Sequence, residues 1–152
     1  MLRFIADSML GRLAIWMRLI GCDVLYYKKI SDDELIKKAL EENRIILTRD
    51  TLLIKRRKAK NHFFVTSDNY EKQLKEVIGH FRLEPFKNIF TRCLLCNTPL
   101  EGIKKGFVKD KVPPYVYETE ERFEFCHSCN KIYWSATHRD NAVRQLKSIL
   151  NQ

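Results

Sequence analysis

The chain has 152 residues, with 28 Lys and Arg against 19 Asp and Glu, so its formal net charge is +9. A hydrophobic fraction of 45% with only 5 Gly and 4 Pro excludes a disordered or fibrous chain. Charged residues interrupt every apolar run well before the roughly 18 residues that a membrane span needs, which excludes a transmembrane protein.

The N-terminal segment and the charge suggest where the protein works and what it meets. Asp7 stands where a signal peptide would need its apolar middle, and no small-residue cleavage site follows. We therefore expect a cytoplasmic protein. The surplus of positive charge favours polyanionic partners such as RNA or DNA, although a lysine-rich surface that only confers solubility is the alternative.

Short apolar segments alternate with helical patterns in the first half of the chain, which is typical of a parallel α/β sheet. We expect a strand over Leu2–Ala6 and then a helix, whose apolar residues recur at helical spacing until Gly21. A second strand follows at Val24–Tyr27. The next helix begins with a capping box formed by Ser31 and Glu34.

The same alternation continues toward the middle of the chain. A third strand is expected over Ile45–Thr48, followed by a short basic helix over Thr51–Lys58. A fourth strand with β-branched and aromatic residues covers His62–Thr66. One last amphipathic helix runs through Tyr70 and Phe81. The prediction is an α/β fold, in which helices flank a parallel sheet.

The composition changes near Pro85, where Pro, Gly and short β-rich stretches replace the α/β pattern. We therefore predict two domains, an α/β domain over residues 1–88 and a second module over residues 89–152. The second module is expected to be a small β-rich ribbon followed by a C-terminal helix.

Four of the 5 cysteines form two pairs, Cys93-x-x-Cys96 and Cys126-x-x-Cys129. Each pair can present two thiolates to one ion, and four thiolates complete the tetrahedral shell of a structural zinc site, less often an iron site. Such a zinc ribbon gains its folding free energy from the metal. His127 is a rival ligand, and redox catalysis by a CxxC pair is the alternative function.

Aspartates stand at the ends of the predicted strands. Asp7, Asp50 and Asp68 follow the first, third and fourth strands, while Asp32 and Asp33 open the helix after the second. The carboxyl ends of parallel strands share one edge, so these acids should meet there and repel one another unless a cation such as Mg²⁺ or Mn²⁺ lies among them. The alternative is that each acid only caps a helix.

Basic and hydroxyl side chains near these acids are candidates for binding RNA phosphates. They are Ser8, Arg12, Arg49, Lys55, Arg56, Arg57, Lys58 and Lys60. In the second module, Phe107, Tyr115 and Tyr133 could stack on bases, with a place in the ribbon core as the alternative.

Several separated motifs resemble one nuclease family. Residues 4–23, Ile-Leu-Thr-Arg-Asp over 46–50 and Thr-Ser-Asp-Asn over 66–69 are similar to the Mut7-C ribonuclease family, PIN-like nucleases with a C-terminal zinc ribbon. Residues 112–117, the two CxxC pairs and Tyr133-Trp134 resemble the ribbon of that family. The resemblance implies a PIN-like fold and covers nearly the whole chain.

The resemblance further implies a divalent-metal-dependent ribonuclease that hydrolyses RNA phosphodiester bonds. The catalytic acids map onto Asp7, Asp33, Asp50 and Asp68, with Asp32 as the rival of Asp33. Asp7 and Asp50 would hold Mg²⁺ or Mn²⁺, while the four paired cysteines hold structural zinc. The alternative is a non-catalytic RNA-binding factor, in translation or associated with ribosomes, that keeps the ribbon and uses the PIN-like domain as a platform.

Overall fold

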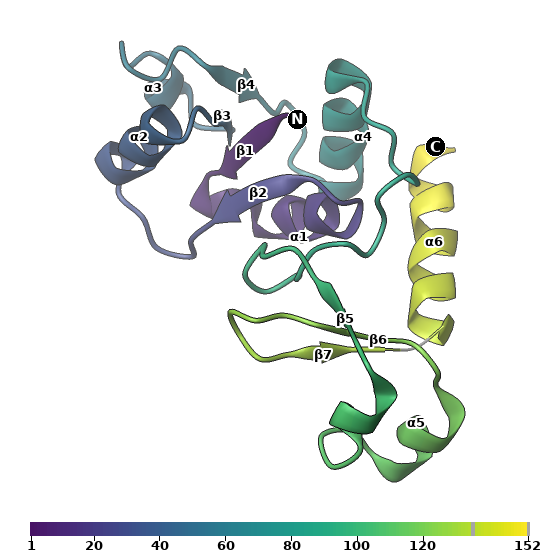
Figure 1. Cartoon of the computed structure of the whole chain (residues 1–152). Coiled ribbons are helices and arrows are strands. Elements are labelled where there is room, and N and C mark those ends of the chain that lie inside the picture. The colour runs from purple at the N-terminus through teal and green to yellow at the C-terminus, as the bar shows by residue number, and fades with distance from the viewer. Residues whose placement is uncertain (135, 152) are drawn as a thin grey trace. The chain divides into compact units, whose positions relative to one another are not determined.

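The computed structural model describes residues 1–134 and 136–151 (Figure 1). It divides into two compact units, Met1–Asn97 and Thr98–Gln152, so residues 89–97 lie with the first unit. The domain boundary at residues 88 and 89 stays a prediction. None of the helices in the described residues is long and apolar enough to cross a membrane.

The first unit is built on a 4-stranded parallel sheet with the order β2-β1-β3-β4. The strands are β1 (Arg3–Ala6), β2 (Asp23–Tyr26), β3 (Ile45–Thr48) and β4 (His62–Phe64). All three strand pairings are parallel, which confirms the predicted sheet. The strands begin and end within two residues of the predicted bounds.

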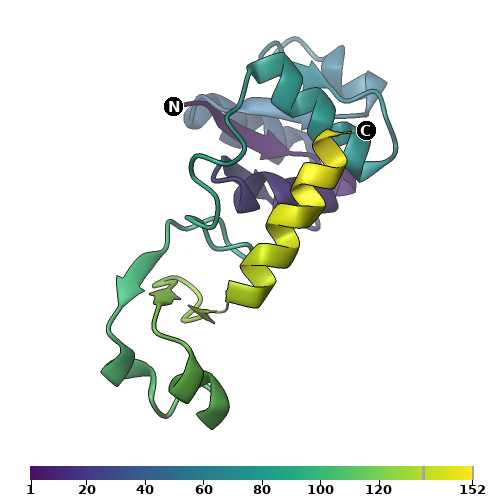
Figure 2. The ribbon, with the colours of Figure 1, turned by 90° about the vertical axis from the view of Figure 1, so that its right-hand side faces the viewer.

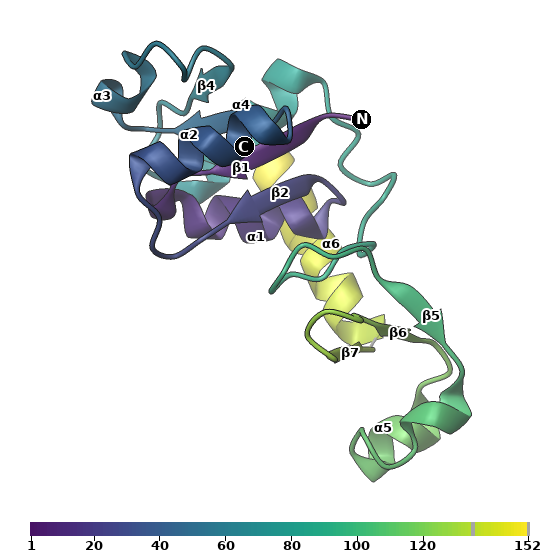
Figure 3. The ribbon, with the colours of Figure 1, turned by 60° about the vertical axis from the view of Figure 1, so that its left-hand side comes forward.

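Helices cover both faces of this sheet. They are the 3-10 helix η1 (Ser8–Leu10), α1 (Gly11–Leu19), α2 (Asp32–Glu41), α3 (Thr51–Ile54) and α4 (Tyr70–Phe81). Ile5 and Ile46 pack with α2 and α3 on one face, where Figure 3 shows α2 in front of β1. On the other face, the ring of Phe4 contacts that of Phe81 in α4 at 5.1 Å, and α4 packs against α1 (Figure 2).

A local signal sets the start of α2, whereas tertiary packing sets the end of α3. The Ser31 side chain accepts a hydrogen bond from the Glu34 amide at 3.2 Å, which confirms one bond of the predicted capping box. Helix α3 ends at Ile54, short of the predicted Lys58. Leu53 and Ala59 are both fully buried in one apolar cluster, although a continued helix would place them about 120° apart around its axis.

The second unit contains a 3-stranded antiparallel sheet with the order β5-β6-β7. Its elements are β5 (Glu101–Ile103), the 3-10 helix η2 (Lys105–Val108), α5 (Pro114–Thr119), β6 (Phe123–Phe125), β7 (Ile132–Tyr133) and α6 (Ala136–Leu150). Val108 and Val116 from the two short helices bury against Phe123 and Ile132 of the sheet. The small sheet therefore gains an apolar core from the segment between β5 and β6.

Candidate functional site

One buried hydroxyl connects two of the predicted catalytic acids at the carboxyl edge of the sheet. Thr48, the last residue of β3, is fully buried, and Asp7 beyond β1 is only 5% exposed. The Thr48 hydroxyl donates to Asp7 Oδ2 at 2.7 Å and accepts a hydrogen bond from the Asp50 amide at 2.9 Å. Because β1 and β3 pair in parallel, their ends bring Asp7 and Asp50 to one place, as expected.

Both acids also cap helices. Asp7 Oδ1 accepts from the Ser8 amide at 2.7 Å, and Asp50 Oδ1 accepts from the Leu52 and Leu53 amides at 2.9 and 3.3 Å. The capping interpretation thus holds for one oxygen of each carboxylate. Among the described residues, no side chain or amide donates a hydrogen bond to Asp50 Oδ2.

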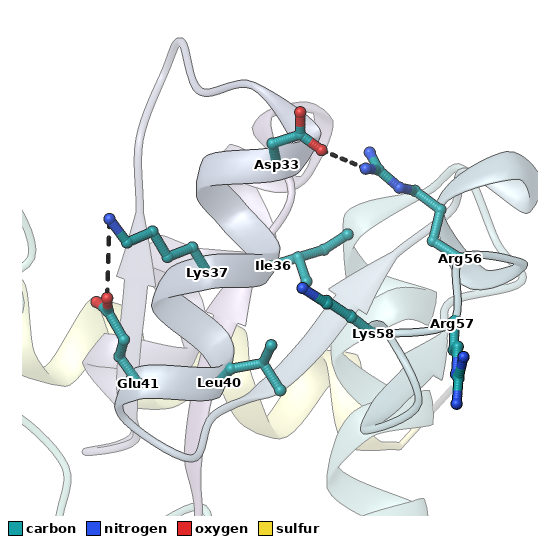
Figure 4. A pocket seen from close by; sticks show the side chains of 8 residues that line it. All are labelled: Asp33, Ile36, Lys37, Leu40, Glu41, Arg56, Arg57 and Lys58. Atoms are coloured by element: carbon teal, nitrogen blue, oxygen red, sulfur yellow. Dashed lines mark hydrogen bonds and ion pairs between the residues drawn. The ribbon is translucent and has the colours of Figure 1, made fainter.

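The electrostatics bring a third acid to this edge. Partial burial raises the pKa of Asp32 above its ordinary value, and the negative charges of Asp50 and Asp7 raise it further. Asp33 instead forms an ion pair with Arg56, drawn in Figure 4. Asp32 therefore feels the charges of Asp50 and Asp7, whereas Asp33 is paired with Arg56, and the predicted role of Asp33 stays a prediction.

The fourth predicted acid, Asp68, is exposed in the turn before α4. Its neighbours Ser67 and Asn69 form the hydrogen bonds of that turn, with the Asn69 amide donating to Ser67 Oγ at 3.1 Å. No hydrogen bond or ion pair in the described part of the chain connects Asp68 with Asp7 or Asp50.

Two arginines lie near the same edge. The Arg12 guanidinium lies over the Tyr70 ring at 3.8 Å, and Tyr70 in turn stacks with Trp16 at 6.4 Å. Arg49, half-buried, donates from Nη2 to the Thr66 carbonyl at 3.4 Å. The aromatic stack orients an exposed Arg12, while a backbone contact holds Arg49.

Three of the remaining basic candidates, Arg56, Arg57 and Lys58, line a hollow of about 640 Å³ between α2 and the chain after α3 (Figure 4). Arg56 pairs with Asp33 and Lys37 with Glu41, whereas Arg57 and Lys58 form no ion pair in the described residues. The remaining residues that line the hollow, Ile36 and Leu40, are apolar. The other predicted RNA-binding residues, Ser8, Lys55 and Lys60, are exposed and do not line this hollow.

Sequence reasoning missed three contacts of this edge. The sequence pattern predicts only a strand position for Thr48, although a hydroxyl residue that ends an apolar run is a visible signal. Tyr70 was assigned only to a helix face. The third missed contact is that of Tyr26, whose hydroxyl donates to the Ser8 carbonyl at 2.8 Å. The Tyr26 oxygen is also close to Gly11, where a Cβ would lie 2.8 Å from it.

The four paired cysteines come together, as predicted, in a cluster that could hold a metal ion. One ligand atom from each of Cys93, Cys96, Cys126 and Cys129 lies within 4.8 Å of all the others. Four sulfur donors suit a structural metal such as zinc. His127, the rival ligand, contacts Glu101 through Nε2 at 2.7 Å instead.

Within residues 1–134 and 136–151, the cysteine cluster is the one group of three or more potential metal ligands whose donor atoms lie this close together. The carboxylates at the sheet edge therefore converge less tightly than the thiolates. Their oxygens are nevertheless the donor type that Mg²⁺ and Mn²⁺ prefer. The donor set at this edge therefore fits a hard divalent ion by chemistry.

Comparison with known proteins identifies the family. The model of the Mut7-C RNAse domain matches residues 2–146, nearly the whole chain. The chain belongs to this family. No curated protein and no solved structure matches it. Membership confirms the resemblance seen in the sequence motifs and indicates a nuclease-like function related to RNA.

Proposed function

We propose that this Mut7-C protein is a divalent-metal-dependent ribonuclease that hydrolyses RNA phosphodiester bonds. The proposal is carried by one observation, the Thr48 hydroxyl that joins the buried Asp7 carboxylate to the Asp50 backbone. A helix cap alone needs no such connection. Asp32, whose pKa is raised by partial burial and by the charges of Asp50 and Asp7, supplies a third carboxylate.

The carboxylates of Asp7, Asp50 and Asp32 would hold Mg²⁺ or Mn²⁺, which supplies an activated water and neutralises charge on the scissile phosphate. Thr48 keeps Asp7 in place, because its hydroxyl fixes Oδ2 while the Ser8 amide fixes Oδ1. The role of Asp33 and Asp68 as further catalytic acids stays a prediction.

Basic residues would bind the RNA on both sides of these acids. Arg12, held over Tyr70, and Arg49 present cations at the sheet edge. Arg57 and Lys58 line the hollow along α2, whose apolar floor suits the sugars and bases of a strand. In the second unit, Phe107 and Tyr115 are 67% and 69% exposed, so both are accessible for stacking on bases.

A cleavage assay tests the proposal. Zinc-loaded protein is incubated with a mixed RNA pool, with and without Mn²⁺, and wild type is compared with Asp50→Asn. Asn still accepts the Leu52 and Leu53 amides but lacks the negative charge, so the helix cap is preserved while ion binding is lost. Asp110→Asn, an exposed acid of the second unit, is the matched control.

We expect cleavage that requires Mn²⁺, is abolished in Asp50→Asn and is unchanged in Asp110→Asn. Equal rates in wild type and Asp50→Asn would instead support the second candidate, a non-catalytic RNA-binding factor. The helix caps formed by Asp7 and Asp50 favour that candidate, since capping gives both acids a structural role without metal.

A further inference from the structure

The segment that carries the first cysteine pair is joined to α1 and β2 of the same unit by hydrogen bonds. The Phe90 amide donates to the Leu19 carbonyl at 2.8 Å, at the end of α1. Arg18, also in α1 and only 3% exposed, donates from Nη1 to the Leu94 carbonyl at 3.0 Å. Its Nε donates to the Val24 carbonyl at 2.9 Å. One buried guanidinium thus joins the Cys93–Cys96 turn to strand β2.

Asn97 makes a second connection between this turn and β2. Its side chain, 5% exposed, accepts from the Val24 amide through Oδ1 at 2.9 Å and donates from Nδ2 to Asp23 Oδ1 at 2.7 Å. Its own amide donates to the Cys93 carbonyl at 2.9 Å and closes the turn. The backbone of Asn97 has a φ of 73°, a conformation that Asn adopts more readily than most residues.

The carboxylate that receives Asn97 is itself held by arginines. Asp23 Oδ1 accepts from Arg44 Nη1 at 2.7 Å, and Asp23 Oδ2 lies 4.0 Å from Arg92 Nη2, directly before Cys93. Arg44 is only 4% exposed. The turn with the two cysteines is therefore joined at both ends to β2, through Asn97 and Arg92, which both approach Asp23.

We propose that Arg18 and Asn97 are positioning residues of the metal site, which keep the Cys93–Cys96 half of it formed before an ion binds. The inference is independent of the proposed ribonuclease function. Groups that orient metal ligands without touching the ion typically change affinity by about 10- to 100-fold when they are removed. Here two side chains orient the Cys93–Cys96 turn. Arg18 in α1 donates to the turn at Leu94, and Asn97 at the end of the turn bonds β2 at Val24.

The coupling is reciprocal. If the bond between Asn97 and Val24 raises metal affinity, metal binding strengthens that bond by the same free energy. Val24 lies on the edge strand β2, and its amide donates to Asn97 Oδ1. Exchange of this amide with solvent consequently reports the metal state of the site from within the parallel sheet.

The first test measures zinc affinity by competition with a chromophoric chelator. Asn97→Gly permits the positive φ but removes both side-chain bonds. We expect it to weaken zinc binding by about 10- to 100-fold. Ser128→Ala is the matched control, since Ser128 adjoins Cys129 and its exposed side chain accepts a hydrogen bond from the Thr98 hydroxyl. Its affinity should equal that of the wild type, and an equal affinity for Asn97→Gly would overturn the proposal.

The second test uses the wild-type chain and holds even where a variant fails to fold. Hydrogen exchange of the Val24 amide is compared before and after removal of zinc, with the Asp7 amide, which donates to the Leu47 carbonyl at 2.9 Å, as internal control. Metal removal should accelerate exchange at Val24 far more than at Asp7. The same change at both amides, or none at Val24, would overturn the proposal.

Discussion

Replacing Thr48 with Val removes one hydroxyl from the carboxyl edge and keeps the shape of the side chain. Two hydrogen bonds are lost, one to the Asp7 carboxylate and one from the Asp50 amide. A bond to a charged group contributes about 1.5–3 kcal/mol and a neutral one about 0.5–1.5 kcal/mol. The fully buried Thr48 site leaves no water to replace them, so we expect a loss of about 2–4 kcal/mol of unfolding free energy.

Urea unfolding of the zinc-loaded protein, followed by circular dichroism, measures this loss. Thr48→Ser is the control, because it keeps the hydroxyl and removes one methyl group, which costs about 1 kcal/mol. Thr48→Ser should also retain Mn²⁺-dependent RNA cleavage, and Thr48→Val should lose most of it. A Val variant as stable as the Ser variant would refute the argument that the hydroxyl holds Asp7 and Asp50 together.

Three further predictions concern the same unit. Because partial burial, Asp50 and Asp7 raise the pKa of Asp32, the folded state binds that proton more tightly than the unfolded state. The stability of wild type relative to Asp32→Asn should therefore fall as pH rises above 3.8. Thermal unfolding of both proteins between about pH 3 and pH 6 measures this, and a difference in melting temperature that does not change with pH would contradict it. Gly11→Ala should destabilise wild type, because the new Cβ would lie 2.8 Å from the Tyr26 oxygen, but should stabilise Tyr26→Ala by up to about 1 kcal/mol through helix propensity. Additive effects of the two substitutions would show that Tyr26 does not restrict Gly11. Replacing Arg57 and Lys58 together with Ala should reduce the slope of log RNA affinity against log salt by about 1.4, whereas Lys75 and Lys87 replaced together should leave it unchanged. An unaltered slope in the first variant would place RNA elsewhere than the hollow along α2.

The sheet could be predicted from the sequence because local signals agreed with the fold. The run Ile45–Thr48 is β3 without any change of bounds, and Ser31 caps α2 as its spacing from Glu34 predicts. The end of α3 could not be predicted, because burial of Ala59 beside Leu53 depends on tertiary packing and not on helix propensity.

The sequence predicts which acids stand at the ends of the strands, but not the hydrogen bonds and ion pairs that connect the residues of the site. Spacing along the chain brings Asp7 and Asp50 to one edge, but it gives no means of choosing between the adjacent Asp32 and Asp33. Nor does the sequence indicate that Arg56, 23 positions further along the chain, pairs with Asp33 across the hollow. The contact of Arg18 with Leu94 joins residues 76 positions apart and leaves no periodic signal in the sequence.

Binding of Mn²⁺ to the zinc-loaded protein, followed by electron paramagnetic resonance, tests the central claim most directly. The signal of free Mn²⁺ reports how much ion is bound, and neither RNA nor catalysis is needed. If Asp7 and Asp50 are metal ligands, wild type binds Mn²⁺ at a site that Asp50→Asn loses while its helix cap is kept. Equal Mn²⁺ binding by wild type and Asp50→Asn would contradict the account and leave these acids as helix caps.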